Sequence, residues 1–187
     1  MSRGSVCPWW LGYALVCPLR RWLADPRPLL APHVAEGALV LEPGCGMGFY
    51  TLDLARLVGP GGRVVAIDLQ RKMLDGLARR AARAGLAARI ETRLAGAESL
   101  GADDLAGQVD VAFVLQMLHE VPDQTAFLAE VKRALKPGGR LVLAEPRGHV
   151  SREDFERSLA LARGLGFADG PAPRASRLHG ATLLNAC

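Results

Sequence analysis

The chain has 187 residues, half of them hydrophobic, and a formal net charge of +4 at pH 7. This length fits one domain with a sizeable core, and the high apolar content excludes an intrinsically disordered chain. The basic residues, nearly all of them arginine, are scattered along the sequence. Nucleic-acid binding needs basic side chains gathered on one face, so the composition argues against a nucleic-acid partner.

The cysteines and the apolar runs indicate the compartment. Cys7, Cys17, Cys45 and Cys187 form no Cys-x-x-Cys pair and no zinc-ligand spacing, which predicts reduced thiols in a cytoplasmic protein. No apolar run reaches the length of a membrane span, so we expect no membrane partner. The run Val6–Leu19 is similar to the apolar part of a signal peptide, but prolines interrupt it and no cleavage site follows, which argues against export.

Residues 1–36 precede the first expected strand and contain all three tryptophans of the chain. An aromatic, apolar run over residues 9–16 predicts a short helix that Pro18 ends or kinks. A second helix is expected over Leu19–Ala24 and another helical turn over Pro28–Val34. The pattern therefore predicts a helical N-terminal cap over residues 1–36, followed by one further domain over residues 37–187.

Buried strands alternate with amphipathic helices through the rest of the chain, which predicts an α/β fold. A capping box, Ser151-x-x-Asp154, predicts the start of a last helix. The expected strands are Ala38–Leu41, Arg63–Ile67, Arg89–Leu94, Val109–Leu115 and Arg140–Ala144, with two more near Pro171–Pro173 and Ala181–Leu184; the expected helices are Phe49–Val58, Lys72–Ala84, one after Asp123 and one after Ser151.

The run from Val40 to Tyr50, VLEPGCGMGFY, joins the first strand to the first helix. Its glycines predict a tight turn in which backbone N–H groups and a helix N-terminus meet a polar ligand, because a Cβ would hold the ligand away. The spacing differs from the dinucleotide motif G-x-G-x-x-G, since Phe49 takes the place of the last glycine. Glu42 would repel a pyrophosphate and suits a ligand with an ammonium group. A glycine turn without a ligand is the alternative.

The segment Glu-Pro-Gly-Cys-Gly-Met-Gly resembles the E/D-x-G-x-G-x-G motif of class I S-adenosylmethionine-dependent methyltransferases. The run Leu-Lys-Pro-Gly-Gly-Arg-Leu-Val-Leu resembles the turn that precedes the fifth strand of that family. The resemblance covers about residue 38 to the end of the chain. It implies a doubly wound, mostly parallel seven-stranded sheet of the Rossmann-like methyltransferase type, closed by an antiparallel hairpin. It also implies that the cap over residues 1–36 is either a lid over the reaction site or a packing element.

The same resemblance implies S-adenosyl-L-methionine as the cofactor, with its methionine end in the glycine turn. Asp68 closes the second strand, where one carboxylate can accept from two adjacent ribose hydroxyls. Family members often carry an aspartate where this chain has Gly96, so the adenine amino group is expected to meet Glu98 or a backbone carbonyl. Leu69 is expected to pack on the adenine face. The full set expected at the cofactor is Glu42, Gly44, Cys45, Gly46, Gly48, Asp68, Leu69, Ala97, Glu98 and Gln116.

Polar side chains follow the fourth and fifth strands. His119 and Glu120 come after the fourth strand, and Glu145 and His149 come after the fifth. These strand ends are neighbours in the implied architecture, so we expect the four side chains to converge. His119 or His149 would then be a general base oriented by a carboxylate. A two-histidine, one-carboxylate metal site and a solvated cluster without a catalytic role are the alternatives, and we predict no resident metal.

A methyl group on a sulfonium is already activated, so no covalent intermediate is needed, and no catalytic triad is recognisable. The sequence therefore predicts direct, in-line methyl transfer to a small-molecule acceptor. A non-catalytic cofactor-binding or partner module on the same fold is the main alternative. A dinucleotide oxidoreductase is a weaker one. A thiophilic metalloid methyltransferase would require Cys7, Cys17 and Cys45 to meet.

Overall fold

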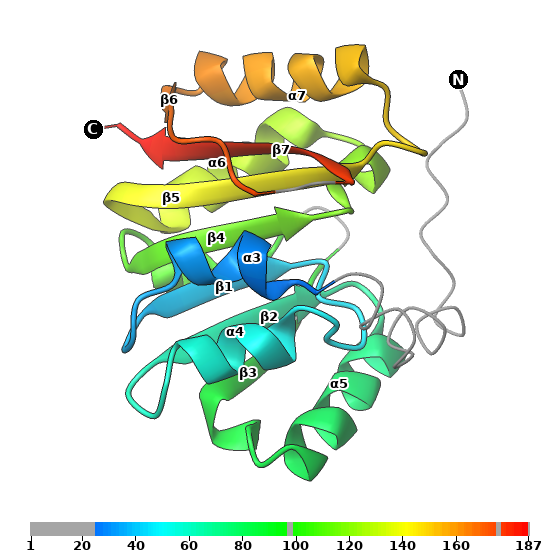
Figure 1. Cartoon of the computed structure of the whole chain (residues 1–187), viewed down its shortest axis with the longest axis vertical. Coiled ribbons are helices and arrows are strands. Elements are labelled where there is room, and N and C mark those ends of the chain that lie inside the picture. The colour runs from blue at the N-terminus through cyan, green and yellow to red at the C-terminus, as the bar shows by residue number, and fades with distance from the viewer. Residues whose placement is uncertain (1–24, 97–98, 175–176, 187) are drawn as a thin grey trace. The chain divides into compact units, whose positions relative to one another are not determined.

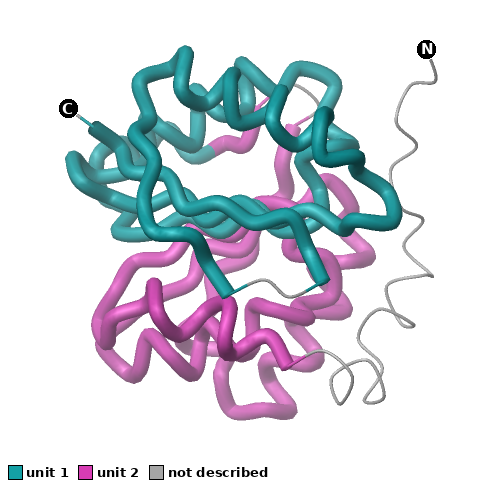
Figure 2. The backbone as a smooth tube through the Cα atoms, turned by 45° about the horizontal axis from the view of Figure 1, so that its top comes forward, with its two compact units in different colours: residues 1–6, 102–187 teal, residues 7–101 magenta. Residues whose placement is uncertain are grey.

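The computed structural model describes residues 25–96, 99–174 and 177–186. The described chain forms two compact units, one within residues 25–101 and one within residues 102–186 (Figure 2). The helices expected over residues 9–16 and 19–24 lie outside the described residues. The third helical turn of the expected cap is confirmed as α3 (Arg27–Leu30) and the 3-10 helix η1 (Ala31–His33). Among the described helices, none has both the length and the apolar character that a membrane span requires.

The unit within residues 25–101 is built on three parallel strands, in the spatial order β3, β2, β1 (Figure 1). In chain order, β1 and β2 are each followed by a helix, so both connections are crossovers of the βαβ kind. The expected strands and helices of this part of the chain are confirmed within two residues. They are β1 (Leu39–Pro43), α4 (Thr51–Leu57), β2 (Arg63–Asp68), α5 (Arg71–Arg83), η2 (Ala87–Arg89) and β3 (Ile90–Leu94).

Burial explains these elements. The side chains of Val40, Leu41 and Val64–Ile67 are almost inaccessible to solvent, as expected for parallel strands covered on both faces. Helix α5 buries an apolar stripe at helical spacing and ends before Gly85, whose φ is +67°. In the parallel register, Glu42 of β1 lies beside Ala66, and Asp68 is the last residue of β2. Both carboxylates therefore stand at carboxyl ends of parallel strands.

The unit within residues 102–186 contains four strands in the order β4, β5, β7, β6 (Figure 1). Strands β4 and β5 are parallel, and β7 pairs antiparallel with both β5 and β6. The expected antiparallel closure is therefore confirmed. The elements are η3 (Asp103–Leu105), β4 (Val109–Leu115), η4 (Leu118–Glu120), α6 (Gln124–Ala134), β5 (Leu135–Pro146), α7 (Arg152–Gly164), β6 (Phe167–Asp169) and β7 (Leu178–Asn185).

Two expectations about this unit are wrong in position. The first strand of the closing pair is β6 at Phe167–Asp169 rather than the Pro171–Pro173 region, because prolines have no N–H to donate to a ladder. The fifth strand starts at Leu135, and the expected turn Lys136–Gly139 is part of it. The pairing jumps from Leu135 opposite Val109 to Arg140 opposite Val111, so these residues form an irregularity inside the strand.

The predicted helix caps are present. The Asp123 side chain accepts a hydrogen bond from Ala126 N at 2.9 Å at the start of α6. At the start of α7, Ser151 Oγ accepts from Asp154 N at 3.0 Å and donates to the Asp154 carboxylate at 2.6 Å. The capping box read from the sequence is therefore confirmed. These caps satisfy N–H groups that a helix leaves without an internal partner.

Asn185, at the end of β7, ties this strand to the end of α6. Its amide group donates to the carbonyl oxygens of Leu135 at 3.0 Å and Lys136 at 3.1 Å, and its Oδ1 accepts from Lys132 Nζ at 2.6 Å. The side chain is 8% exposed. Because the contact with the Leu135 carbonyl is buried and those with Lys132 and Lys136 are partly buried, the asparagine replaces solvent for several polar groups at once.

An Asn185→Ala variant is expected to lose about 2 kcal/mol of unfolding free energy, because buried carbonyl oxygens would lose their donors. Urea unfolding followed by circular dichroism measures the change. Arg133→Ala, which removes an exposed ion pair with Asp103, is the matched control and should change stability by less than about 0.5 kcal/mol. Equal stabilities of the two variants would contradict this role of Asn185.

Candidate functional site

The turn after β1 has the backbone that its glycines predict. Gly44, Gly46 and Gly48 have φ angles of +70°, +53° and +81°, a region that side-chain-bearing residues rarely occupy. The N–H groups of Gly44 and Cys45 donate to the Ile67 carbonyl at 2.8 and 3.1 Å. These bonds anchor the turn to the end of the neighbouring strand β2.

Asp68 also holds the turn. Its Oδ2 accepts from Gly46 N at 2.9 Å, and its Oδ1 accepts from Gln70 N at 2.8 Å. Burial raises the pKa of Asp68, while the two backbone N–H groups act in the opposite direction. A Cβ built on Gly46 would meet no described atom within 4 Å, so the space over this glycine is open. Each carboxylate oxygen has two lone pairs, so Asp68 keeps acceptor capacity for a ligand hydroxyl.

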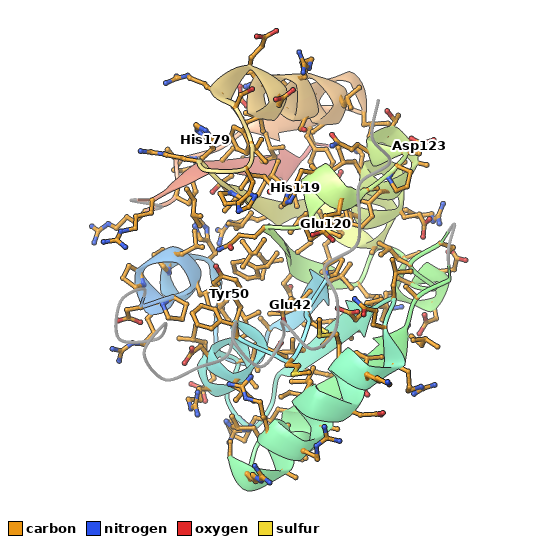
Figure 3. The ribbon with its side chains drawn as sticks, turned by 90° about the vertical axis from the view of Figure 1, so that its right-hand side faces the viewer. Glu42, Tyr50, His119, Glu120, Asp123 and His179 are labelled. Carbon is orange, nitrogen blue, oxygen red and sulfur yellow. The ribbon has the colours of Figure 1, made fainter. Side chains whose placement is uncertain are left out.

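Glu42 is the most deeply buried acid of this turn (Figure 3), with 2% of its surface exposed. Its Oε2 has no hydrogen-bond partner among the described residues, and neither has Thr51 Oγ1. Burial raises the pKa of Glu42 to about 8, the nearby Thr51 hydroxyl acts in the opposite direction, and the charge of Asp68 adds to the rise. A buried acceptor without a donor is costly, and a ligand ammonium group would supply that donor. This orphaned oxygen fits the methionine end of the expected cofactor.

Cys45 lies next to these acids and is a buried free thiol. Burial raises its pKa well above the ordinary value, and the carboxylates of Glu42 and Asp68 raise it further. A thiol that stays protonated is a poor nucleophile and a poor metal ligand. The other cysteines of the metalloid hypothesis, Cys7 and Cys17, lie outside the described residues.

The expected adenine contacts are described only in part. Leu69 is 51% exposed, so its side chain is accessible to a flat ring that packs against it. Gly96 N donates to the Ser99 carbonyl at 3.0 Å. Ala97 and Glu98 lie outside the described residues.

The unit within residues 102–186 carries a second polar cluster, centred on Glu145 at the end of β5. This carboxylate is 2% exposed. Its Oε1 accepts from Leu118 N at 2.7 Å, and its Oε2 lies 2.6 Å from His119 Nδ1. Burial raises the pKa of Glu145, while the neighbouring His119 opposes the rise. With Glu145 ionised, Nδ1 of His119 is the donor, and Nε2 is left as a proton acceptor.

Other side chains hold the segment that carries His119. Gln124 of α6 donates from Nε2 to the Leu118 carbonyl at 3.1 Å, and its Oε1 accepts from Ser158 Oγ of α7 at 2.7 Å. Leu118, the residue before His119, is thus held at its N–H by Glu145 of β5 and at its carbonyl by Gln124 of α6. Neither Gln124 nor Ser158 was predicted from the sequence as a site residue. Their only signal is their position next to the apolar stripes of two helices.

Two further histidines of this unit, His149 and His179, lie near His119 and Glu145. The His149 ring lies nearly parallel to the His119 ring, with centroids 6.4 Å apart. His179 lies opposite Glu145 in the β5–β7 pairing and stacks on Phe155, at 5.5 Å between ring centroids. Figure 3 labels His119, Glu120 and His179 among the side chains of this unit. His179 was not selected from the sequence, because only strand pairing brings it to Glu145.

Glu120 and Gln116 flank the cluster along the chain. Glu120 is half-buried and ends η4. Gln116 directly follows β4, donates from its N–H to the Ala144 carbonyl at 2.7 Å, and has a φ of +59°. It is the one non-glycine residue with positive φ in the part of the chain that the structure describes, and such strained residues gather at functional sites. No group of three or more His, Cys, Asp or Glu side chains among the described residues is arranged to hold a metal ion.

A glycine turn entered from a buried acid, with a second acid closing the next parallel strand, is typical of nucleoside-binding α/β proteins. The comparison with known families makes the class specific. A family model described as "Methyltransferase domain" matches residues 35–164. This match covers more than half of the chain, and the chain therefore belongs to the methyltransferase domain family.

Curated relatives and solved structures agree with this assignment. The chain is 36% identical over 108 residues to a ubiquinone biosynthesis O-methyltransferase of Xanthomonas axonopodis pv. citri, covering 58% of this chain and 43% of the relative. It is 37% identical over 126 residues to the nocamycin O-methyltransferase of Saccharothrix syringae, covering 66% of this chain and 40% of the relative. The chain thus spans less than half the length of these relatives.

The structure is similar to that of a SAM-dependent methyltransferase from Aquifex aeolicus, with a TM-score of 0.84 and 25% sequence identity over 97% of this chain and all of the other. This match confirms the Rossmann-like methyltransferase fold expected from the sequence, a doubly wound and mostly parallel sheet of seven strands. S-adenosyl-L-methionine is the cofactor that this family and fold imply, and the open glycine turn with its orphaned carboxylate oxygen fits it.

The raised pKa of Glu42 has a consequence for stability. The carboxyl group loses its proton at about pH 4.5 in the unfolded chain but only at about pH 8 in the folded one. Between these values the folded state binds more protons, so this group's contribution to stability falls as the pH rises. The unfolding free energy of Glu42→Gln, taken relative to that of the wild type, should therefore be about 3 kcal/mol higher at pH 8 than at pH 5.

Urea unfolding of the ligand-free proteins at the two pH values measures this gain. Glu36→Gln changes an exposed glutamate of the same unit and serves as the control, for which the difference from wild type should not change with pH. A Glu42→Gln protein whose stability follows that of the wild type over this range would show that Glu42 ionises normally.

Proposed function

We propose that this chain transfers the methyl group of S-adenosylmethionine to a hydroxyl group of a small molecule, by direct in-line displacement with His119 as the general base. The observation that carries the proposal is the contact of 2.6 Å between His119 Nδ1 and the buried Glu145 carboxylate. Two relatives named as O-methyltransferases support a hydroxyl acceptor.

On the cofactor side, Glu42 accepts from the ammonium group and Asp68 accepts from the ribose hydroxyls. The glycine turn presents its backbone, and Leu69 covers one face of the adenine ring. The bound cofactor supplies a methyl group that is activated by its positively charged sulfur. The support for these roles is the unpartnered Oε2 of Glu42, the open space over Gly46 and the exposed side chain of Leu69.

On the acceptor side, a hydroxyl group is a weak nucleophile until its proton is removed. His119 Nε2 would take this proton as the acceptor oxygen reacts with the methyl group that bound S-adenosylmethionine would supply. Glu145 holds the imidazole through Nδ1 and stabilises the imidazolium that results. S-adenosylhomocysteine and the methyl ether are the products. Glu120 flanks this group along the chain and belongs to the acceptor side of the proposal, whereas Gln116 remains one of the residues proposed for the cofactor.

His149 is the other histidine that the sequence analysis considered as a base. Its ring lies beside that of His119, but the hydrogen bond to the buried carboxylate belongs to His119. An orienting carboxylate is the feature that distinguishes a base from a solvated histidine. The same feature argues against a purely cofactor-binding module, which has no need for an oriented imidazole.

The cofactor half of the proposal is tested by calorimetry with S-adenosylhomocysteine. The wild-type protein should bind it, and Asp68→Ala should bind at least about tenfold more weakly, because hydrogen bonds to a charged group are lost. Asp75→Ala changes an exposed aspartate of α5 and should bind as the wild type does. A folded wild-type protein that produces no heat with this nucleoside would contradict the proposal.

The catalytic half is tested with S-adenosylmethionine and two hydroxylated probes, catechol and 3,4-dihydroxybenzoate, with methyl ethers identified by mass spectrometry. His119→Ala and Glu145→Gln should each lower the turnover rate by about 100-fold or more, since general-base catalysis typically contributes that much. Their affinity for S-adenosylhomocysteine should stay that of the wild type. His33→Ala is the control. Unchanged turnover in His119→Ala, or a larger loss in His149→Ala, would assign the base elsewhere.

A further inference from the structure

The charged residues of α5 do not all face solvent. Arg80 is half-buried, and its Nη1 donates to the carbonyl oxygens of Met47 and Gly48, the second at 2.9 Å. Both carbonyls belong to the glycine turn, more than thirty residues earlier in the sequence. We propose that Arg80 is a positioning residue, which fixes the peptide groups of this turn in the orientation that S-adenosylmethionine requires.

Each peptide unit is planar, so the positions of the Met47 and Gly48 carbonyl groups fix the planes of two successive peptide units. The plane that contains the Met47 carbonyl also contains the N–H of Gly48, and the plane of the Gly48 carbonyl contains the N–H of Phe49. Gly48 N donates back to the Cys45 carbonyl at 2.9 Å. One guanidinium thus sets the direction of the peptide dipoles through the second half of the turn.

The packing of α5 supports the same contact. A Cβ built on Gly76 would lie 2.9 Å from Met47 Cγ and 3.1 Å from its Sδ, and a Cβ on Gly48 would clash with Leu77 Cδ1. Gly76, Leu77 and Arg80 occupy one face of the helix, at positions i, i+1 and i+4. The apolar contacts hold the turn close to the helix, but they are non-directional. The guanidinium hydrogen bonds are directional, and they reach the Met47 and Gly48 carbonyl groups, which the Asp68 hydrogen bond does not.

Such a restraint matters because the turn contains three glycines in left-handed conformations, and glycine has more backbone freedom to lose than any other residue. A ligand that must order a loose turn binds more weakly than one that meets an ordered turn. Arginine suits this role because it stays charged and presents several donors in a rigid plane. The inference rests on the proposed use of this turn as the cofactor site.

The test measures affinity for S-adenosylhomocysteine by calorimetry in the full chain. Arg80→Met keeps the apolar stem and removes the donors, and it should bind about tenfold more weakly. Arg80→Lys retains a cation without the planar fork and should recover part of the loss. Arg83→Met makes the same charge change at an exposed position of the same helix, and its affinity should stay within about twofold of the wild type.

A kinetic measurement separates positioning from a general structural role. In Arg80→Lys the KM for S-adenosylmethionine should rise severalfold, with kcat at saturating cofactor unchanged. Wild-type affinity in Arg80→Met, or in Arg80→Lys where the methionine variant does not fold, would overturn the inference. A fall in kcat as large as the rise in KM would also overturn it. A wild-type protein that does not bind S-adenosylhomocysteine would refute the proposed function instead.

Discussion

One hydrogen bond, from Gly46 N–H to the Asp68 carboxylate, joins the glycine turn after β1 to the end of β2. It works together with the two N–H groups that donate to the Ile67 carbonyl. The turn can therefore keep several left-handed glycines without losing its shape. Everything proposed for the cofactor depends on this anchoring, because an unanchored glycine turn presents no fixed set of donors.

Both polar clusters follow the same physical pattern in their own units. An acid stands at the carboxyl end of a buried strand, and its side chain is 2% exposed in each case, for Glu42 and for Glu145. They differ in how that burial is compensated. Glu145 has a backbone N–H and an imidazole as partners, whereas one oxygen of Glu42 has none in the described chain. Glu145 thus organises protein groups, whereas the unpartnered oxygen of Glu42 is the one that we propose for a ligand.

The sequence predicted the elements well where one local signal dominates. The buried apolar runs of β1, β2 and β4, the Asp123 cap and the capping box at Ser151 are local, and the structure confirms them. The closing strand β6 was misplaced because its extended conformation depends on pairing with β7. Arg80 was not predicted as a site residue. Its position, three residues after Leu77 on the apolar side of α5, is the signal that would have identified it. Gln124 and His179 needed tertiary contacts that no local pattern contains.

The neutral state of buried Glu42 at pH 7 has a bearing on turnover. If this carboxyl group receives the cofactor's ammonium as proposed, the first loading of the empty protein expels a proton, because the cation favours the ionised acid. Cofactor and demethylated product carry the same ammonium group. Replacement of one by the other then leaves the carboxylate ionised, so repeated cycles exchange no protons at this position. A proton is therefore released from this acid when the cofactor first binds to the empty turn, but not when product and cofactor later exchange.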